Sequence, residues 1–281
     1  MSVKAEPIPS AFVWRRLHSL LGLWLVIYLM EHLITNSQAA LWIGDDGQGF
    51  VRTVNAIQHL PYLKAIEVVL LGVPILLHGV WGVKRAFTAK SNAHSTNGSK
   101  PSLPYSRNRA FSWQRLTSWV LLVGIILHVV QMRFMDYPTK VRVLDQERFF
   151  VKLKYDEGLM TLAPRLGVKI YDKIPRILEG KNFSLKENEV AAETTTPGAA
   201  MLLSTRDTFK SPVMGVLYTI FVLAAAFHAF NGVWTSLITW GAILSFKSQN
   251  WMVKLCGAFM LVFIFLGLAA IWGSYWINLR T

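Results

Sequence analysis

Four histidines lie inside stretches of the sequence that are otherwise apolar. They are His32, His78, His128 and His228. Imidazole is the commonest metal ligand among side chains and also carries protons near neutral pH. An ionisable side chain inside a membrane-spanning segment is costly, and it usually faces the protein interior and has a function. Either metal binding or proton transfer is therefore expected where these histidines meet.

The composition is that of a membrane protein that crosses the bilayer several times. The chain has 281 residues, of which 53% are hydrophobic and 16% are charged, with a net charge of +13. The basic residues flank the apolar stretches, as they do in the loops that orient membrane proteins, so no nucleic-acid partner is expected. Cys256 is the only cysteine. A disulfide within the chain, a cysteine-ligated iron–sulfur cluster and a covalently attached c-type haem are therefore excluded.

Five apolar stretches are long enough to cross a bilayer, which takes about 20 residues. The predicted helices cover about 17–37, 62–83, 113–133, 212–243 and 251–277. The predicted fold is all-α, with a core of the four histidine-bearing helices and a fifth helix. Pro74 predicts a kink in the second helix. The first stretch also resembles a cleavable signal peptide, but Glu31 and His32 interrupt the apolar region that a signal needs.

Residues 134–211 are polar and mixed in charge, without an apolar run of membrane-spanning length. Prolines punctuate the segment, and it is long for a connection between helices. It is predicted to be an extramembrane insertion or to be partly disordered. It carries no catalytic motif, and we expect that shortening it leaves the histidine sites intact.

The loops indicate how the chain is oriented. Outside the insertion, the N-terminal segment, the 84–112 loop and the 244–250 turn together hold most of the Lys and Arg, whereas the 38–61 loop holds one basic residue. Basic loops stay in the cytoplasm. The N-terminus is therefore expected in the cytoplasm, with the 134–211 insertion on the outer side.

The four histidines are predicted to lie at two depths. At ~1.5 Å per residue, His32 and His128 lie roughly 22 Å from the cytoplasmic ends of their helices. His78 and His228 lie roughly 24 Å from the outer ends of theirs, close to the cytoplasmic side of a ~30 Å hydrocarbon layer. The two levels are about 16 Å apart.

Two imidazoles from different helices at one depth can be the axial ligands of a haem iron. We therefore predict an inner haem held by His78 and His228 and an outer haem held by His32 and His128, which together form an electron path. Glycines one turn from the histidines leave room for a flat ring, although small residues also serve helix packing. They are Gly82, Gly124 and Gly232. An alternative function, from a different class of protein, is a transporter whose buried His and Glu side chains relay protons. This alternative predicts that no haem is bound.

Further ionisable residues flank the two predicted levels. Candidates to pair with haem propionates, or to lie at the interface, are His18, Arg15, Arg16, Arg85 and Arg115. A quinone site needs hydrogen-bond donors and a source of protons. Candidates for it near the outer level are Glu31, Glu67, His59 and Arg133. Each acid could instead brace its helix through a hydrogen bond.

Several of these residues lie in segments with a familiar pattern. The chain resembles the cytochrome b membrane-anchor subunits of succinate dehydrogenase and fumarate reductase, in the single-chain, five-helix, di-haem class. The segments that carry the resemblance are Arg15–Gly22, Glu31–Leu33, Leu60–Glu67, His78–Lys90, Gln114–His128 and Phe227–Gly241. Together they cover the four histidine-bearing spans. The 134–211 insertion departs from the family pattern.

The resemblance implies two haem b groups paired as above, in a bacterial cytoplasmic membrane. It also implies a flavoprotein with FAD and an iron–sulfur protein docked on the cytoplasmic face. Succinate would be oxidised on those partners, and electrons would pass through the inner and the outer haem to a quinone, with menaquinone the expected one. The direction of electron flow is left open, because a fumarate reductase anchor carries electrons along the same path in reverse. A cytochrome b anchor of a hydrogenase or a formate dehydrogenase is a further alternative.

Overall fold

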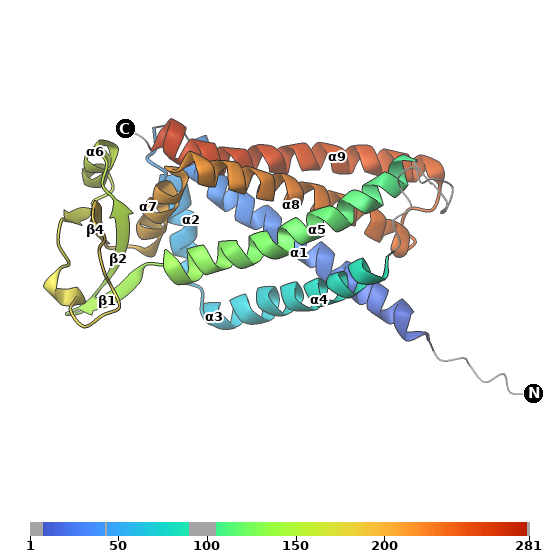
Figure 1. Ribbon diagram of the computed structural model, residues 1–281, viewed down its shortest axis with the longest axis horizontal. Coiled ribbons are helices and arrows are strands. Elements are labelled where there is room, and N and C mark those ends of the chain that lie inside the picture. Colours follow the sequence, from blue (N-terminus) through green and yellow to red (C-terminus); the bar gives the residue numbers. More distant parts are fainter. Residues whose placement is uncertain (1–7, 43, 90–104, 280–281) are drawn as a thin grey trace, which may run out of the picture. The chain divides into compact units, whose positions relative to one another are not determined.

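The computed structural model describes residues 8–42, 44–89 and 105–279. Its five helical segments long and apolar enough to cross a membrane are α1 (Ser10–Leu41), the segment Leu63–Thr88, the segment Ser106–Met135, α8 (Pro212–Thr239) and the segment Phe246–Asn278 (Figure 1). This confirms the predicted class of a helical protein with five membrane spans. Lys90 and Lys100 of the predicted basic loop lie outside the described residues.

Three of the spans change helix type along their length. The second consists of α3 (Leu63–Ile66), a π-helix (Glu67–Gly72) and α4 (Val73–Thr88). The third is α5 (Ser106–Val129) followed by a π-helix (Val130–Met135), and the fifth is α9 (Phe246–Leu268) followed by a π-helix (Ala269–Asn278). π-Helical turns are rare and occur most often at functional sites.

The helix ends differ from the predicted ones. Helices α1 and α5 begin seven residues before the predicted starts at 17 and 113 (17 − 10 and 113 − 106), because a helix can continue past arginines such as Arg15 and Arg16 in α1 and Arg107 and Arg109 in α5. Helix α8 ends at Thr239, before the predicted 243, and Gly241 there has a φ of 74°. Glycine adopts this left-handed conformation without strain and commonly terminates helices. At Pro74, where a kink was predicted, the π-helix of the second span immediately precedes α4.

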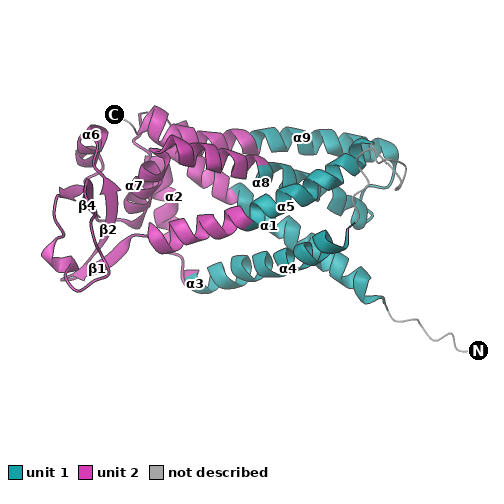
Figure 2. Ribbon diagram, viewed as in Figure 1, with its two compact units in different colours: residues 1–30, 64–122, 224–262 teal, residues 31–63, 123–223, 263–281 magenta. Residues whose placement is uncertain are grey.

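The chain divides into two compact units, which Figure 2 colours separately. Unit 1 comprises residues 1–30, 64–122 and 224–262, and unit 2 comprises residues 31–63, 123–223 and 263–281. Unit 1 therefore holds His18, His78 and His228. Unit 2 holds His32 and His128, together with the whole 134–211 insertion.

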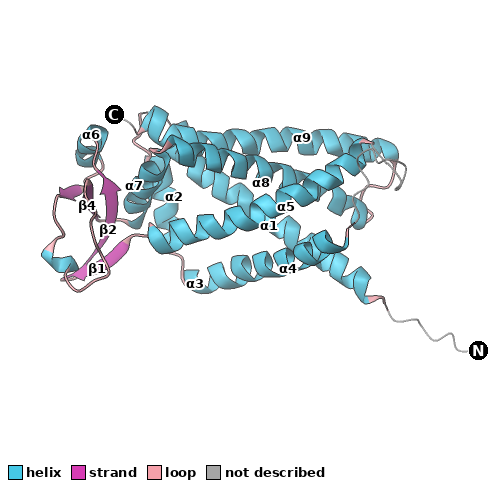
Figure 3. Ribbon diagram, in the orientation of Figure 1, coloured by secondary structure: helices cyan, strands magenta, loops and turns pink. Residues whose placement is uncertain are grey.

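The insertion contains an antiparallel sheet that the sequence did not predict (Figure 3). The strand order is β1 (Thr139–Val143), β2 (Gln146–Lys154), β4 (Glu189–Thr194) and β3 (Lys169–Tyr171). Its helices are α6 (Glu157–Arg165), the 3-10 turn Arg176–Leu178 and α7 (Pro197–Phe209). Strands β1 and β2 form a local hairpin through the two residues Leu144 and Asp145, whereas β4 pairs with β2 and β3 across longer separations in the sequence.

One hydrophobic core joins the insertion to the rest of unit 2. The predicted 38–61 loop contains a helix, α2 (Gln48–Gln58), that packs against α7. Core members from outside the insertion include Ala39, Phe50, Val51, Val54 and Leu279, and members from within it include Leu153, Leu159, Leu202 and Leu203. Because a shared core loses packing when half of it is removed, the insertion is not the removable connection that the sequence suggested.

A buried ion pair ties α7 to α6 and to the C-terminal end of the chain. Arg206 is 1% exposed and donates to both carboxylate oxygens of Asp156, at 2.9 and 2.7 Å, and to the Leu279 carbonyl, at 2.7 Å. Lys210 donates to the same carboxylate at 2.9 Å. Burial alone would raise the pKa of Asp156, but hydrogen bonds from Arg206 and Lys210 outweigh it and hold the pKa well below its usual range.

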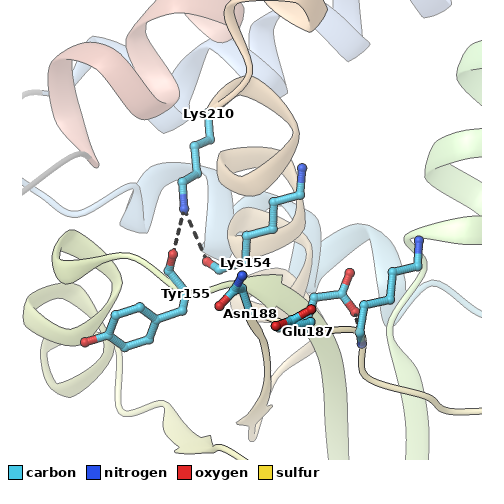
Figure 4. A pocket seen from close by; sticks show the side chains of 7 residues that line it. Lys154, Tyr155, Glu187, Asn188 and Lys210 are labelled. Carbon is cyan, nitrogen blue, oxygen red and sulfur yellow. Dashed lines mark hydrogen bonds between the residues drawn. The ribbon is translucent and has the colours of Figure 1, made fainter.

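Lys210 also forms one side of a pocket on the surface of the insertion (Figure 4). Its ammonium donates to the backbone carbonyls of Lys154 and Tyr155, at 3.4 and 3.1 Å. The remaining lining side chains are the exposed Lys186, Glu187 and Asn188 and the half-buried Glu189. The Lys210 ammonium is already paired with protein oxygens. We therefore assign no ligand to this pocket.

We predict that Asp156→Asn destabilises unit 2 at neutral pH by about 3–5 kcal/mol, because Arg206 stays buried without its counter-charge. A carboxyl with a depressed folded pKa stabilises the fold above its unfolded pKa of about 3.9, and this contribution is lost as the pH falls below that value. The variant should therefore lose part of the acid sensitivity of the parent. Thermal unfolding and limited proteolysis in detergent between pH 3 and 7 measure both effects. Asp145→Asn, at a fully exposed side chain, is the control, and equal behaviour of the two variants would contradict the assignment.

Candidate functional site

His32 and His128 face each other in unit 2. Their ring centroids are 5.8 Å apart, and the ring planes are inclined at 85°. His32 lies on α1, and His128 lies in the last turn of α5, just before the π-helix Val130–Met135. These are the two histidines that the depth calculation put at the outer level.

Unit 1 brings together three histidines. The rings of His78, on α4, and His228, on α8, are 6.3 Å apart at an angle of 78°. His18, on α1, stacks in parallel on His78 with centroids 3.9 Å apart and planes within 10°. His78 and His228 are the pair predicted to share the inner level. The role of each pair as iron ligands remains a prediction.

The spacing of both pairs suits an iron between two imidazoles. Metal–imidazole bonds in proteins are about 2 Å long. Two such bonds in line, with the distance from each nitrogen to its ring centre, span roughly 6 Å. The observed separations of 5.8 and 6.3 Å agree with this value. Two neutral nitrogen donors of this kind are a haem donor set, so the residues present fit haem b.

A metal-bound histidine uses its second ring nitrogen for a hydrogen bond that fixes the orientation of the ring. The Nδ1 atom of His78 lies 3.1 Å from the His18 carbonyl oxygen, and that of His128 lies 3.2 Å from the Tyr218 hydroxyl. The Nδ1 atom of His228 lies 3.5 Å from the Thr117 hydroxyl. That hydroxyl already donates to backbone carbonyls, so it is free to accept. In all three cases Nε2 is the nitrogen left to bind iron.

His32 has a different neighbour. The Asn36 amide nitrogen lies 3.5 Å from Nδ1 of His32, and it donates to the His32 carbonyl at 2.7 Å. The oxygen and nitrogen of an amide are assigned by their hydrogen bonds. If the Asn36 amide turned its oxygen toward Nδ1 of His32, it would lose the 2.7 Å bond to the His32 carbonyl.

The five candidates for pairing with haem propionates differ in their surroundings. Nδ1 of His18 is buried and has no hydrogen-bond partner among the described residues, and His18 interacts electrostatically with Arg85. A buried nitrogen without a partner is costly, and an acidic group of a ligand would satisfy it. Arg16 lies over the Phe12 and Trp240 rings.

The remaining two candidates are the half-buried Arg115 and the exposed Arg15. Arg115 lies over the Phe111 ring and donates to Ser112 at 3.5 Å. His18 fits best beside the inner pair, because its buried Nδ1 has no partner among the described residues, and its interaction with the exposed Arg85 adds that residue as the second candidate.

The glycine that leaves room for an imidazole is not one of those singled out in the sequence. A Cβ atom on Gly22 would lie 2.9 Å from Cε1 of His78, so a larger residue there would push the ring aside. The space beside Gly124 is filled by the Phe221 ring, which is ordinary helix packing. A Cβ atom on Gly82 would meet His18 at 3.8 Å, an ordinary contact.

Three of the four quinone candidates belong to unit 2. Glu31 accepts a hydrogen bond from the Thr35 hydroxyl at 2.8 Å. His59 is exposed, and its Nδ1 lies 2.6 Å from the Asn55 carbonyl. Arg133 lies over the Tyr137 ring at 4.5 Å. Glu67 belongs to unit 1, where it begins the π-helix that precedes Pro74.

A polar network beside His228 was missed from the sequence. Gln114 donates to the His228 carbonyl at 3.0 Å and accepts from Asn231 at 2.7 Å. Trp234 in turn donates to Asn231 at 2.9 Å. Asn231 lies one turn after His228 in an apolar span. A polar residue in this position is the signal by which the network could have been predicted.

The sequence is 28% identical to the succinate dehydrogenase cytochrome b558 subunit of Bacillus subtilis (strain 168). The match extends over 261 residues, which are 92% of this chain and 95% of that protein. The chain is therefore similar, over nearly its whole length, to a cytochrome b subunit of succinate dehydrogenase. No family model matches the sequence, and no solved structure gives a significant match.

The contribution of the network beside His228 to stability can be measured. We predict that Gln114→Leu lowers stability by about 1–3 kcal/mol, because the Asn231 amide nitrogen loses its acceptor and the His228 carbonyl loses its side-chain donor in an apolar environment. Thermal unfolding in detergent is the measurement. Ser118→Ala, on the same helix, removes only a hydrogen bond to the nearby Arg115 carbonyl. Equal stability of the two variants would show that the network contributes nothing.

Proposed function

We propose that this chain is the cytochrome b membrane anchor of a succinate dehydrogenase and that it holds two haem b groups. The observation that carries the proposal is the match to a subunit of that name over 92% of the chain. The two imidazole pairs support it from an independent direction. Transport of a solute by a histidine–glutamate relay would not require the imidazoles to be spaced for an iron.

His78 and His228 hold the haem nearer the cytoplasm, and His32 and His128 hold the outer one. Bound haem would supply one-electron redox chemistry at its iron. The protein contributes the orientation of the rings: the His18 carbonyl and the Thr117 and Tyr218 hydroxyls engage Nδ1 and leave Nε2 for the metal. Such contacts also raise the basicity of the ligand and tune the metal.

The partners are a flavoprotein with FAD and an iron–sulfur subunit, docked on the cytoplasmic face. They oxidise succinate, and this chain anchors them and conducts electrons to the quinone. The basic residues at the ends of α4 and α5, including Lys84, Arg85 and Arg107, form the surface suited to this docking under the positive-inside orientation. The membrane is the bacterial cytoplasmic membrane, with the N-terminus inside.

The quinone, with menaquinone the expected species, binds near the outer pair. Reduction of a quinone to a quinol takes up two protons, so the site needs acids that connect to water. Glu31 is exposed and shares unit 2 with His32 and His128. Its bond from Thr35 leaves the second carboxylate oxygen available. Arg133 and His59 are hydrogen-bond donors of the same unit, and Glu67 is the second acid.

The haem assignment predicts the spectrum of the protein. The purified complex should be red and show a reduced b-type spectrum with two components. His228→Leu should remove the inner component and spare more of the outer one, and His128→Leu should do the reverse, because each removes one axial ligand. His59→Leu, at an exposed histidine, is the control for haem binding. A colourless protein, or loss of the same component from both variants, would overturn the assignment.

The quinone assignment predicts a separate defect. Glu31→Gln or Glu67→Gln should slow succinate-driven quinone reduction roughly ten- to a hundredfold, because general acid–base catalysis contributes on the order of 10²–10⁴. Both haems should remain bound and reducible by succinate. Steady-state quinone reduction and haem spectra are measured on the same membranes, with Glu157→Gln in α6 as the control. Unchanged quinone reduction in both variants would move the site to the inner side, near His18 and Arg15.

A further inference from the structure

A chain of hydrogen bonds leads from His128 into the insertion. Nδ1 of His128 lies 3.2 Å from the Tyr218 hydroxyl, and that hydroxyl donates to the Gln131 side-chain oxygen at 3.2 Å. The Gln131 amide donates to the Thr208 hydroxyl at 3.4 Å. Thr208 donates to the Ser204 carbonyl at 3.1 Å. All five residues belong to unit 2.

The far end of this chain sets its direction: Thr208 donates its proton to the Ser204 carbonyl and accepts from the Gln131 amide, so the Gln131 oxygen is the atom that faces Tyr218. The Tyr218 hydroxyl donates its single proton to the Gln131 oxygen. It must therefore accept a hydrogen bond from Nδ1–H of His128. Nε2 of His128 then carries the lone pair that a metal needs. Each onward bond strengthens the one before it, because hydrogen bonds in a row polarise one another in a low dielectric. The geometry thus selects the tautomer of His128 that ligates iron through Nε2.

Packing holds the central member of the chain in place. The Tyr218 ring packs edge-on against Phe209, with centroids 5.1 Å apart, and against His128 at 5.8 Å. Gln131 lies in the π-helix Val130–Met135, where the extra residue per turn alters which side chains face Tyr218. Thr208 and Phe209 are buried residues of α7. The far end of the chain therefore rests on the insertion and not on a membrane span.

We propose that Tyr218 is a positioning residue for His128, and that Gln131 and Thr208 connect it to α7, so that the insertion helps to set the redox potential of the outer haem. This rests on the proposed function only in that His128 must be an iron ligand. A ligand whose Nδ1–H has a good acceptor is more basic and stabilises the ferric state. The chain therefore lowers the midpoint potential of the outer haem.

The test is a redox titration, followed by visible spectra, of the complete complex carrying single variants. Tyr218→Phe keeps the ring and removes the hydroxyl, and it should shift the outer ferric–ferrous equilibrium about tenfold toward ferrous, or about +59 mV for a one-electron couple. Gln131→Leu and Thr208→Val cut the chain further from the ligand and should give successively smaller shifts of the same sign. The inner haem should keep its potential in every variant and serves as the internal reference.

Tyr275→Phe is the matched control, because Tyr275 packs in the same aromatic cluster as Tyr218 but is outside the hydrogen-bond chain. The EPR spectrum of the ferric outer haem, which reports the orientation of its axial imidazoles, should change in Tyr218→Phe and not in Tyr275→Phe. If Tyr218→Phe does not accumulate, Gln131→Leu carries the test.

Unchanged outer potential and EPR spectrum in Tyr218→Phe and Gln131→Leu, with both haems bound, would overturn the proposal and leave Tyr218 a packing residue. Shifts as large in Tyr275→Phe would overturn it as well. Failure of the proposed function looks different: the parent complex would lack haem, or His128→Leu would keep the outer component.

Discussion

The structure depends on how polar ring nitrogens are satisfied inside apolar helices. A buried imidazole has two nitrogens, and a nitrogen without a partner costs about 1–3 kcal/mol. In His78, His128 and His228 one nitrogen contacts a protein oxygen. The other nitrogen, Nε2, is the one that the proposed haem iron would take. Gly22 matters for the same reason, since it leaves the His78 ring the room to take its position.

The two imidazole pairs are supported in different ways. In unit 1, a backbone carbonyl and a threonine engage the ligands, and Gln114, Asn231 and Trp234 brace the helix that carries His228. In unit 2, a tyrosine engages His128, and its partners lead to α7. Because contacts to the second nitrogen tune a bound metal, two chemically similar pairs acquire different environments. A difference in potential between two haems is what directs electrons along a path.

The insertion, residues 134–211, also helps to hold the surroundings of the imidazole pair in unit 2. Its sheet and its two α-helices share one core with α2 and with the end of the chain, and Arg206 links α7 to Asp156 and Leu279. Helix α7 then leads directly into α8, which carries Tyr218 and His228. A folded element of this kind can hold the start of a membrane helix rigidly, which a disordered connection of the same length cannot do.

The sequence by itself determined the five apolar spans and the four interior histidines, and the rise of a helix divided the histidines into the two pairs that the structure brings together, because long apolar runs and the rise of a helix are local properties. The resemblance to the cytochrome b anchors also rested on short segments around these residues. The tertiary structure alone decided which groups satisfy each imidazole. Tyr218 meets His128 across 90 residues of sequence and Thr117 meets His228 across 111, so no periodicity relates them. It also decided that residues 134–211 form a sheet with a shared core, because β4 pairs with strands that are not adjacent to it in sequence and the core includes residues from α2 and from Leu279.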